Sequence, residues 1–180
     1  MPPLIWTSFP PIAANARPMR QPGSLTARLA RGGAISVEVL RSGWQPARPD
    51  EAAALGLARP GQRVYVREVC VSRNGQPAVL ARSATTRAGL LGPWRGLRSL
   101  GRQPLATLLW SDPRIRRGPF EYTWLPGPSP AKRLPARRSC FWRDGQPLVV
   151  REAFVGLPWP AVAWLARRRR WLAGGSPPRT

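Results

Sequence analysis

The strongest pattern in the chain is a pair of segments rich in β-branched and other apolar residues on both sides of an Asn-Gly pair, between Arg63 and Thr86. Asn74 and Gly75 readily take the two positive-φ conformations of a type I′ turn. The strand before them is rich in β-branched residues, namely Val64, Val66, Val69 and Val71. A second segment, Ser139 to Val155, repeats the design, with RDGQP in place of RNGQP. The pattern predicts two β-hairpins in one antiparallel sheet.

Each predicted hairpin places one charged residue on a face that is otherwise apolar. Arg67 shares its face of the first strand with Tyr65, Val69 and Val71. Glu152 shares its face of the last strand with Leu148, Val150 and Phe154. A charge in apolar surroundings is costly unless it is paired or bound to a ligand. Arg67 and Glu152 are therefore the leading candidates for a functional site, and mutual pairing across the sheet is the structural alternative.

The rest of the chain contributes short helices and two further strands. Ser24 suits the N-cap of a helix over Leu25–Ala30. Further elements are predicted at Ile35–Trp44 (strand), Asp50–Leu57 (helical turn), Pro104–Trp110 (helix) and Phe120–Trp124 (strand). This order predicts an α+β fold, a single domain with a mainly antiparallel sheet of about six strands and helices covering one face. We expect residues 24–160 to form this domain, residues 1–23 an irregular N-terminal arm, and residues 161–180 a basic, aromatic tail.

Composition bears mainly on the choice of partner. The chain of 180 residues has 29 basic residues and a net charge of +21, which is typical of proteins that bind nucleic acids. Lys132 is the only lysine, however, and the arginines are spread along the chain, as a GC-rich coding bias would produce. We therefore expect no specific nucleic-acid partner. Nucleic-acid binding stays an alternative that would require charge gathered on one face beside exposed aromatic side chains.

Several kinds of chemistry are excluded by residues that the sequence lacks. It has no histidine and no Cys-x-x-Cys pair, so zinc sites and His-dependent catalytic triads are excluded. Cys70 and Cys140 lie in predicted strands and are expected to be reduced core residues. No apolar run reaches the roughly 18 residues of a membrane span, and the N-terminus lacks the basic start of a signal peptide. We expect a cytoplasmic monomer without a bound metal.

Five segments, in this order and spacing, resemble the chorismate pyruvate-lyase family, bacterial enzymes that make 4-hydroxybenzoate for ubiquinone synthesis. They read SLTARLARGGAISVEVLRSGW, VYVREVCVSRNGQPAVLARS, LGRQPLATLLW, IRRGPFEY and ARRSCFWRDGQPLVVREAFVGLP. The resemblance covers about residues 24–160. It implies a six-stranded antiparallel sheet with helices on one face and an enclosed cavity. It also implies that pyruvate is removed from chorismate without a cofactor.

By position in these motifs, the resemblance assigns the site to five residues: Arg67, Leu105, Glu152, Leu25 and Arg117. Arg67 would bind a substrate carboxylate, and Glu152 would bind the ring hydroxyl and help to move the proton lost on aromatisation. Arg117, or its neighbours Arg114 and Arg116, would take the second carboxylate. Leu105 and Leu25 would line the apolar wall, although core packing explains both equally well. The family has methionine at the position of Leu25.

Two further alternatives concern binding without catalysis and the tail. Ligand-sensing domains of bacterial transcription regulators share this type of fold, so the chain could bind an aromatic acid without turning it over. The run Arg167–Arg170, flanked by Trp164 and Trp171, is interpreted as a solvated basic helix end. Its alternative is an interfacial segment that contacts anionic lipid.

Overall fold

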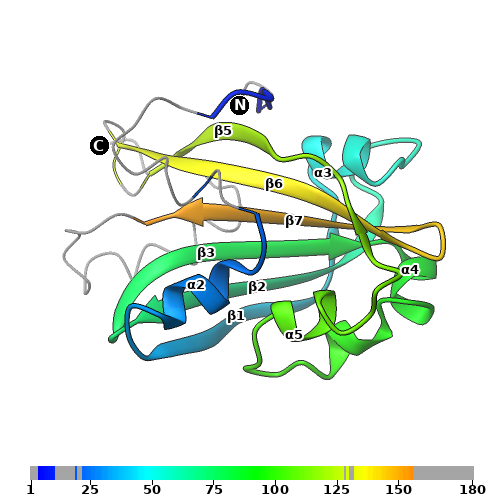
Figure 1. Cartoon of the computed structure of the whole chain (residues 1–180). Helices are drawn as coiled ribbons and strands as arrows, with labels where there is room; N and C mark the ends of the chain where they lie inside the picture. The colour runs from blue at the N-terminus through cyan, green and yellow to red at the C-terminus, as the bar shows by residue number, and fades with distance from the viewer. Residues whose placement is uncertain (1–3, 11–18, 20–21, 128, 130–131, 156–180) are drawn as a thin grey trace.

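The computed structural model describes residues 4–10, 19, 22–127, 129 and 132–155, and its centre is a seven-stranded sheet (Figure 1). Neighbouring strands follow the order β1-β2-β3-β7-β6-β4. Both β4 and β5 pair with the outer edge of β6, β5 along its first half and β4 near its end. The strands are β1 (Ile35–Pro46), β2 (Arg63–Arg73), β3 (Gln76–Thr85), β4 (Arg116–Arg117), β5 (Glu121–Pro126), β6 (Arg133–Arg143) and β7 (Gln146–Phe154). Every pairing is antiparallel, so the predicted type of sheet is confirmed.

Two hairpins supply the four central strands. Their turns have the predicted positive-φ pairs, with φ of 50° at Asn74, 75° at Gly75, 49° at Asp144 and 74° at Gly145. The first strands of the hairpins also share residues at equal spacing, since Arg63, Arg67, Cys70 and Arg73 recur as Arg133, Arg137, Cys140 and Arg143. The hairpins meet along β3 and β7, so β2 and β6 lie on the outside of these four strands.

Apolar side chains cover both faces of the sheet. One face packs against α2 (Leu25–Ala30), α4 (Arg87–Leu91), η1 (Arg95–Arg98) and α5 (Ala106–Leu109), with α2 and α5 in front of the strands in Figure 1. The other face packs against α3 (Pro49–Ala54), where Ala52 contacts the cluster that includes Val64 and Val66. Because successive residues of a strand point to opposite faces, β2 is buried on both sides.

Most of the predicted elements are confirmed, and a few need correction. α2 has the predicted bounds, and Ser24 is its N-cap. The sheet has seven strands instead of about six because the two-residue β4 adds to it, and α4 was not predicted. α5 begins at Ala106, later than the predicted start at Pro104. Helices cover more than one face, because α3 packs opposite to the others.

Beneath α3, the second face of the sheet carries a buried cluster of charges. Arg82 of β3 donates hydrogen bonds of 2.7 Å to Glu68 Oε1 and of 2.7 Å to Glu51 Oε2. Glu51, Glu68 and Arg82 are 3%, 0% and 4% exposed. Glu51 also accepts a hydrogen bond from the backbone N–H of Arg48 at the start of α3. The cluster therefore ties α3 to β2 and β3.

The described part of the N-terminal arm runs beside β5. Thr7 and Tyr122 exchange backbone hydrogen bonds of 2.9 and 2.7 Å. The Trp6 indole donates to Asp50 Oδ2, and the Trp6 ring centroid lies 4.4 Å from Cζ of Arg138. The tail predicted at residues 161–180 lies outside the described residues. Within the described part of the chain, no helix is long and apolar enough to cross a membrane.

Candidate active site

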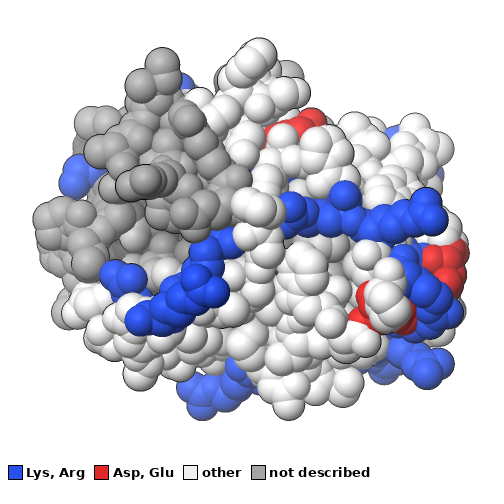
Figure 2. All heavy atoms as spheres, viewed as in Figure 1, with Lys and Arg blue, Asp and Glu red and all other residues white. Residues whose placement is uncertain are grey.

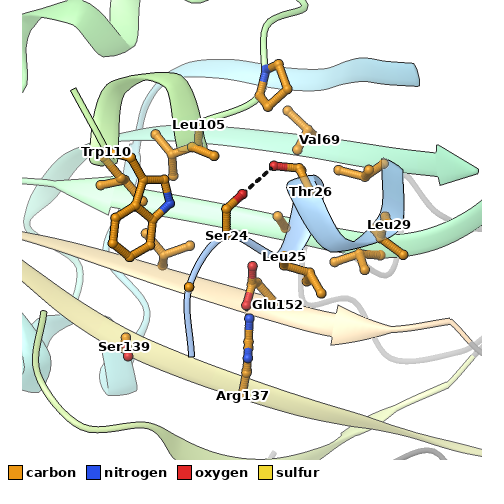
Figure 3. A pocket seen from close by; sticks show the side chains of 18 of the residues that line it. Ser24, Leu25, Thr26, Leu29, Val69, Leu105, Trp110, Arg137, Ser139 and Glu152 are labelled. Carbon is orange, nitrogen blue, oxygen red and sulfur yellow. Dashed lines mark hydrogen bonds and ion pairs between the residues drawn. The ribbon is translucent and has the colours of Figure 1, made fainter. Parts of the chain in front are cut away.

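A cavity lies between the sheet and the helices α2 and α5 (Figure 3). The sheet side of the wall includes Val37, Val69, Val79 and Val150. The helix side includes Leu25, Leu29, Leu105 and Leu109. The ionisable residues that line the cavity are Arg117, Arg137 and Glu152. A mostly apolar wall with a few charged groups is the usual form of a small-molecule site.

The charged part of the wall centres on Glu152 of β7 and Arg137 of β6, which lie directly opposite each other in the sheet. Arg137 Nε donates a 2.5 Å hydrogen bond to Glu152 Oε2, and Arg137 Nη1 donates one of 2.9 Å to the carbonyl oxygen of Met19. Figure 3 shows the guanidinium aimed at the Glu152 carboxylate. Glu152 Oε1 has no hydrogen-bond partner among the described residues.

Aromatic rings complete the surroundings of Arg137. Its Cζ lies 4.2 Å from the ring centroid of Phe120 and 5.6 Å from that of Phe154. The Arg137 side chain is 2% exposed, whereas that of Glu152 is 19% exposed. The arginine is therefore fixed within the wall, and the carboxylate is the more accessible member of the pair.

Arg117 of β4 also contacts Phe120, and its Cζ lies 4.2 Å from the centroid of that ring. No residue of the described part of the chain forms a hydrogen bond or an ion pair with its guanidinium. Burial, and after it the charge of Arg137, lowers the pKa of Arg117, but an arginine remains charged at neutral pH. Arg114 pairs with Asp112 and Arg116 is exposed. Of the three candidate arginines, Arg117 is the one that lines the cavity.

The segment between β4 and β5 is held against β6 by Ser139. The Ser139 hydroxyl donates toward the carbonyl oxygens of Gly118 and Pro119, at 3.3 and 3.2 Å. Together with the 2.8 Å hydrogen bond from the Gly118 N–H to the Cys140 carbonyl oxygen, these contacts hold the backbone between Arg117 and Phe120. Sequence reasoning did not single out Ser139.

The two leucines expected at the wall come from the starts of two short helices. Ser24 Oγ accepts a 3.1 Å hydrogen bond from the Ala27 N–H and lies 3.1 Å from Thr26 Oγ1 (Figure 3). This cap begins α2 at Leu25, whose side chain is buried against the cavity. Leu105 occupies the N-cap position of α5 and lines the cavity from the opposite helix.

Arg67 of β2 is buried beside the cavity and does not belong to its lining. Its Nη2 donates hydrogen bonds of 2.9 Å to the carbonyl oxygen of Gly101 and of 2.8 Å to that of Gln103. These bonds anchor the segment that leads into α5. The Nε and Nη1 groups of Arg67 form no hydrogen bond with the described residues. Burial lowers the pKa of this guanidinium.

The structure thus brings four of the five predicted site residues to one cavity: Leu25, Leu105, Arg117 and Glu152. The alternative in which Arg67 and Glu152 pair across the sheet is wrong, because Arg67 holds backbone carbonyls and Glu152 pairs with Arg137. Sequence reasoning missed Arg137. Its signal was available, since Arg137 alternates with Ser139 and Phe141 on one face of a strand, but that strand begins at Arg133, before the predicted hairpin.

The chain matches the family model described as "Chorismate lyase" over residues 7–160. It belongs to the chorismate lyase family. A probable chorismate pyruvate-lyase of Bordetella avium is 40% identical over 153 residues, covering 79% of this chain and 77% of the relative. A probable chorismate pyruvate-lyase 2 of Pseudomonas entomophila is 44% identical over 147 residues, covering 78% of this chain and 79% of that protein.

Solved structures of regulator domains share the fold of this chorismate lyase family member. The PhnF C-terminal domain superposes with a TM-score of 0.54 and 20% identity, covering 70% of this chain and 86% of that one. The effector domain of PhnF from Mycobacterium smegmatis gives a TM-score of 0.53 and 15% identity, covering 74% of this chain and 89% of its own. At such low identity the similarity establishes the fold alone.

Proposed function

We propose that the cavity binds chorismate and converts it to 4-hydroxybenzoate and pyruvate. Membership of the chorismate lyase family, over residues 7–160, is the observation that carries this proposal. In the reaction, the ether bond between the ring and the enolpyruvyl group breaks, and the ring carbon bearing the hydroxyl loses its proton. The ring becomes aromatic, and enolpyruvate takes up a proton to become pyruvate. The protein therefore has to bind and orient the substrate, accept one proton and limit the access of water.

Glu152 is proposed to hydrogen-bond the ring hydroxyl and to help move the proton. Its Oε2 is held by Arg137 and its Oε1 has no partner among the described residues, which supports an acceptor role toward the ligand. A general base must lie within hydrogen-bonding reach of the proton that it removes. A carboxylate on the cavity wall meets that requirement for a ring bound beside it.

The two carboxylates of chorismate are proposed to bind Arg67 and Arg117. Arg117 lines the cavity without an ion-pair partner in the described part of the chain. Arg67 lies in the strand row Arg67–Ser83–Val150, next to the row that contains Glu152, and keeps Nε and Nη1 unused by described residues. Charge-assisted bonds of this kind are about twice as strong as neutral ones. Leu25 and Leu105 are proposed to enclose the ring between them.

The proposed ligands are thus chorismate and 4-hydroxybenzoate, and the protein is proposed to act as a monomer. For the run Arg167–Arg170, which lies outside the described residues, a solvated basic end is the simpler interpretation. If it were an interfacial segment instead, sedimentation with anionic vesicles would fall after truncation before Ala161. Equal sedimentation of both proteins would remove the membrane alternative.

The direct test is to incubate the purified protein with chorismate and to follow pyruvate and 4-hydroxybenzoate together. We expect both products in equal amounts, well above the spontaneous rate, with the activity lost in Glu152→Ala. Arg114→Ala, which changes an exposed arginine, is the matched control and should retain the activity. Saturable binding of 4-hydroxybenzoate without turnover would instead indicate a ligand-binding domain, as in the regulators that share the fold.

A further inference from the structure

The Arg137 side chain is held in the cavity wall by four contacts. Its Nε holds Glu152 Oε2 at 2.5 Å, its Nη1 holds the Met19 carbonyl at 2.9 Å, and its guanidinium lies against the rings of Phe120 and Phe154. It is 2% exposed, although removing a guanidinium from water is costly unless its contacts compensate. This arrangement needs an explanation beyond stability, because an apolar pair of similar volume could pack as well.

We propose that Arg137 is the positioning residue for Glu152. By holding Oε2, Arg137 fixes the rotamer of the carboxylate and turns Oε1 toward the ligand. This inference rests on the proposed function, since it assigns the proton-accepting role to Oε1. Arg137 acts through Glu152 and not on the reacting atoms.

The geometry of the sheet supports a role that only arginine can fill. Arg137 and Glu152 are a directly opposed pair on neighbouring strands, so their backbones cannot shift apart without breaking the register. The planar guanidinium contacts a carboxylate, a carbonyl oxygen and two aromatic rings at once. A lysine ammonium is a compact charge on a flexible stem and cannot present flat faces to rings while holding two acceptors at fixed angles.

The binding of substrate should depend much less on Arg137 than the chemical step does. The proposed carboxylate ligands are Arg67 and Arg117, and the ring packs on Leu25 and Leu105; none of these four side chains hydrogen-bonds to Arg137. In Arg137→Gln we therefore expect kcat to fall by on the order of 100-fold, the usual effect of a misplaced catalytic group. KM and the Kd for 4-hydroxybenzoate should change only a few-fold.

The test is a double-mutant cycle on the full chain, with kcat and KM measured for wild type, Arg137→Gln, Glu152→Gln and the double variant. If Arg137 acts through Glu152, removing it from Glu152→Gln causes no further loss of kcat, because the two residues work as a unit. Equal losses of kcat in both backgrounds would overturn the inference. So would wild-type kcat in Arg137→Gln.

Two controls separate positioning from a general effect on the fold. Arg138→Gln changes the next residue of β6, whose Nε donates a 2.8 Å hydrogen bond to Glu121 Oε2 on the opposite face of the sheet. This variant should leave kcat unchanged. Arg137→Lys, checked by its thermal melting and its binding of 4-hydroxybenzoate, tests the same point if Arg137→Gln does not fold: kcat should fall with KM nearly unchanged. A lysine variant with wild-type kcat would refute the need for arginine.

Wild-type protein without lyase activity would overturn the proposed function, and this inference with it. Additive losses of kcat in an active enzyme would overturn the inference alone.

Discussion

The buried arginines differ in what their guanidinium groups hold. Arg67 holds two backbone carbonyls, Arg82 two carboxylates on the second face, and Arg137 one carboxylate and one carbonyl. Arg117 has an aromatic ring and no described acceptor. A charged donor within an apolar wall binds an anion strongly because few other groups solvate it. This is why Arg117 is proposed to bind a substrate carboxylate.

Replacing Arg67 should weaken binding more than it slows chemistry. In Arg67→Ala, the loss of a charge-assisted hydrogen bond, worth about 1.5–3 kcal/mol, should raise KM and the Kd for 4-hydroxybenzoate roughly 10- to 150-fold. The melting temperature should also fall, because the carbonyls of Gly101 and Gln103 lose their donor. Steady-state kinetics and calorimetric titration check this, with Arg114→Ala as control. A variant with unchanged Kd would remove Arg67 from the site.

The Cys140 thiol should titrate only at high pH. Burial raises its pKa from 9.0 to about 11, because the thiolate is poorly solvated there. Alkylation of Cys140 by iodoacetamide, measured in a Cys70→Ala background, should therefore be slow at pH 8 and reach half of its full rate only near pH 11. A reaction as fast as that of a free thiol at pH 8 would contradict the shift.

The same pKa shift of Cys140 implies a loss of stability in alkaline solution. The thiol ionises more easily in the unfolded chain than in the folded one, so its contribution is complete below pH 9 and is lost as the pH rises through about 11. Urea unfolding at pH 8 and pH 10.5 should show a smaller alkaline loss in Cys140→Ala than in wild type. Identical losses would mean that other groups control the alkaline limit.

Among the elements, those marked by local signals were predictable from the sequence. Ser24 caps α2, and Asn74-Gly75 and Asp144-Gly145 close the hairpins, each through contacts within a few residues. β4 has no such signal, because it exists through its pairing with Phe141 and Trp142 of a distant strand. α4 does carry one that the prediction overlooked, since the Thr86 hydroxyl caps it by accepting a hydrogen bond from the Gly89 N–H. The start of β6 contains Pro135, which argued against a strand there. Arg137 was missed for that reason.

The position of α3 could not be derived from periodicity. Val64 and Val66 point to one face of β2 and Val69 and Val71 to the other, so the alternation that marks a half-buried strand is absent, and both faces need a cover. Which face receives which helix depends on side chains far apart in sequence, such as Glu51 and Arg82.

The contact between α3 and the sheet should depend strongly on Glu51. In Glu51→Ala, Arg82 keeps a buried charge with fewer acceptors, so the free energy of unfolding should fall by about 3–5 kcal/mol. Urea titration at pH 7 measures this. Glu121→Ala is the control, because Glu121 is the more exposed partner of Arg138 and its removal should cost at most ~1 kcal/mol. Equal losses in both variants would contradict the proposed tie.

At the scale of the whole molecule, neither the fold nor the distribution of charge identifies the function. The residues that line the cavity do limit the kind of ligand that it can bind. The fold is shared with effector domains of regulators, and in Figure 2 lysine and arginine side chains lie in several places across the visible face. The cavity instead combines apolar walls with two arginines and one glutamate, a set that suits an aromatic anion. Family membership then supplies the reaction, which the fold alone could not.

Ligand binding should stabilise the entire domain. With 4-hydroxybenzoate at 100 times its Kd, the free energy of unfolding should rise by about 2.7 kcal/mol, which raises Tm by roughly 5–10 °C for a chain of this size. The neutral 4-hydroxybenzamide, at the same concentration, should raise Tm much less, because it offers no charge to the arginines. Thermal scans with the two compounds make the comparison. Equal shifts would show that the arginines do not recognise the carboxylate.

The recurrence of Arg67 as Arg137 gives the central sheet an approximate two-fold symmetry, with the axis between β3 and β7. A symmetric sheet alone would not favour one orientation of an asymmetric ligand over the other. That preference has to come from places where the halves differ: Arg67 faces Ser83 across its strand pair, whereas Arg137 faces Glu152. The Arg137–Glu152 pair, which the first hairpin lacks, would then help to set the direction in which the ring lies.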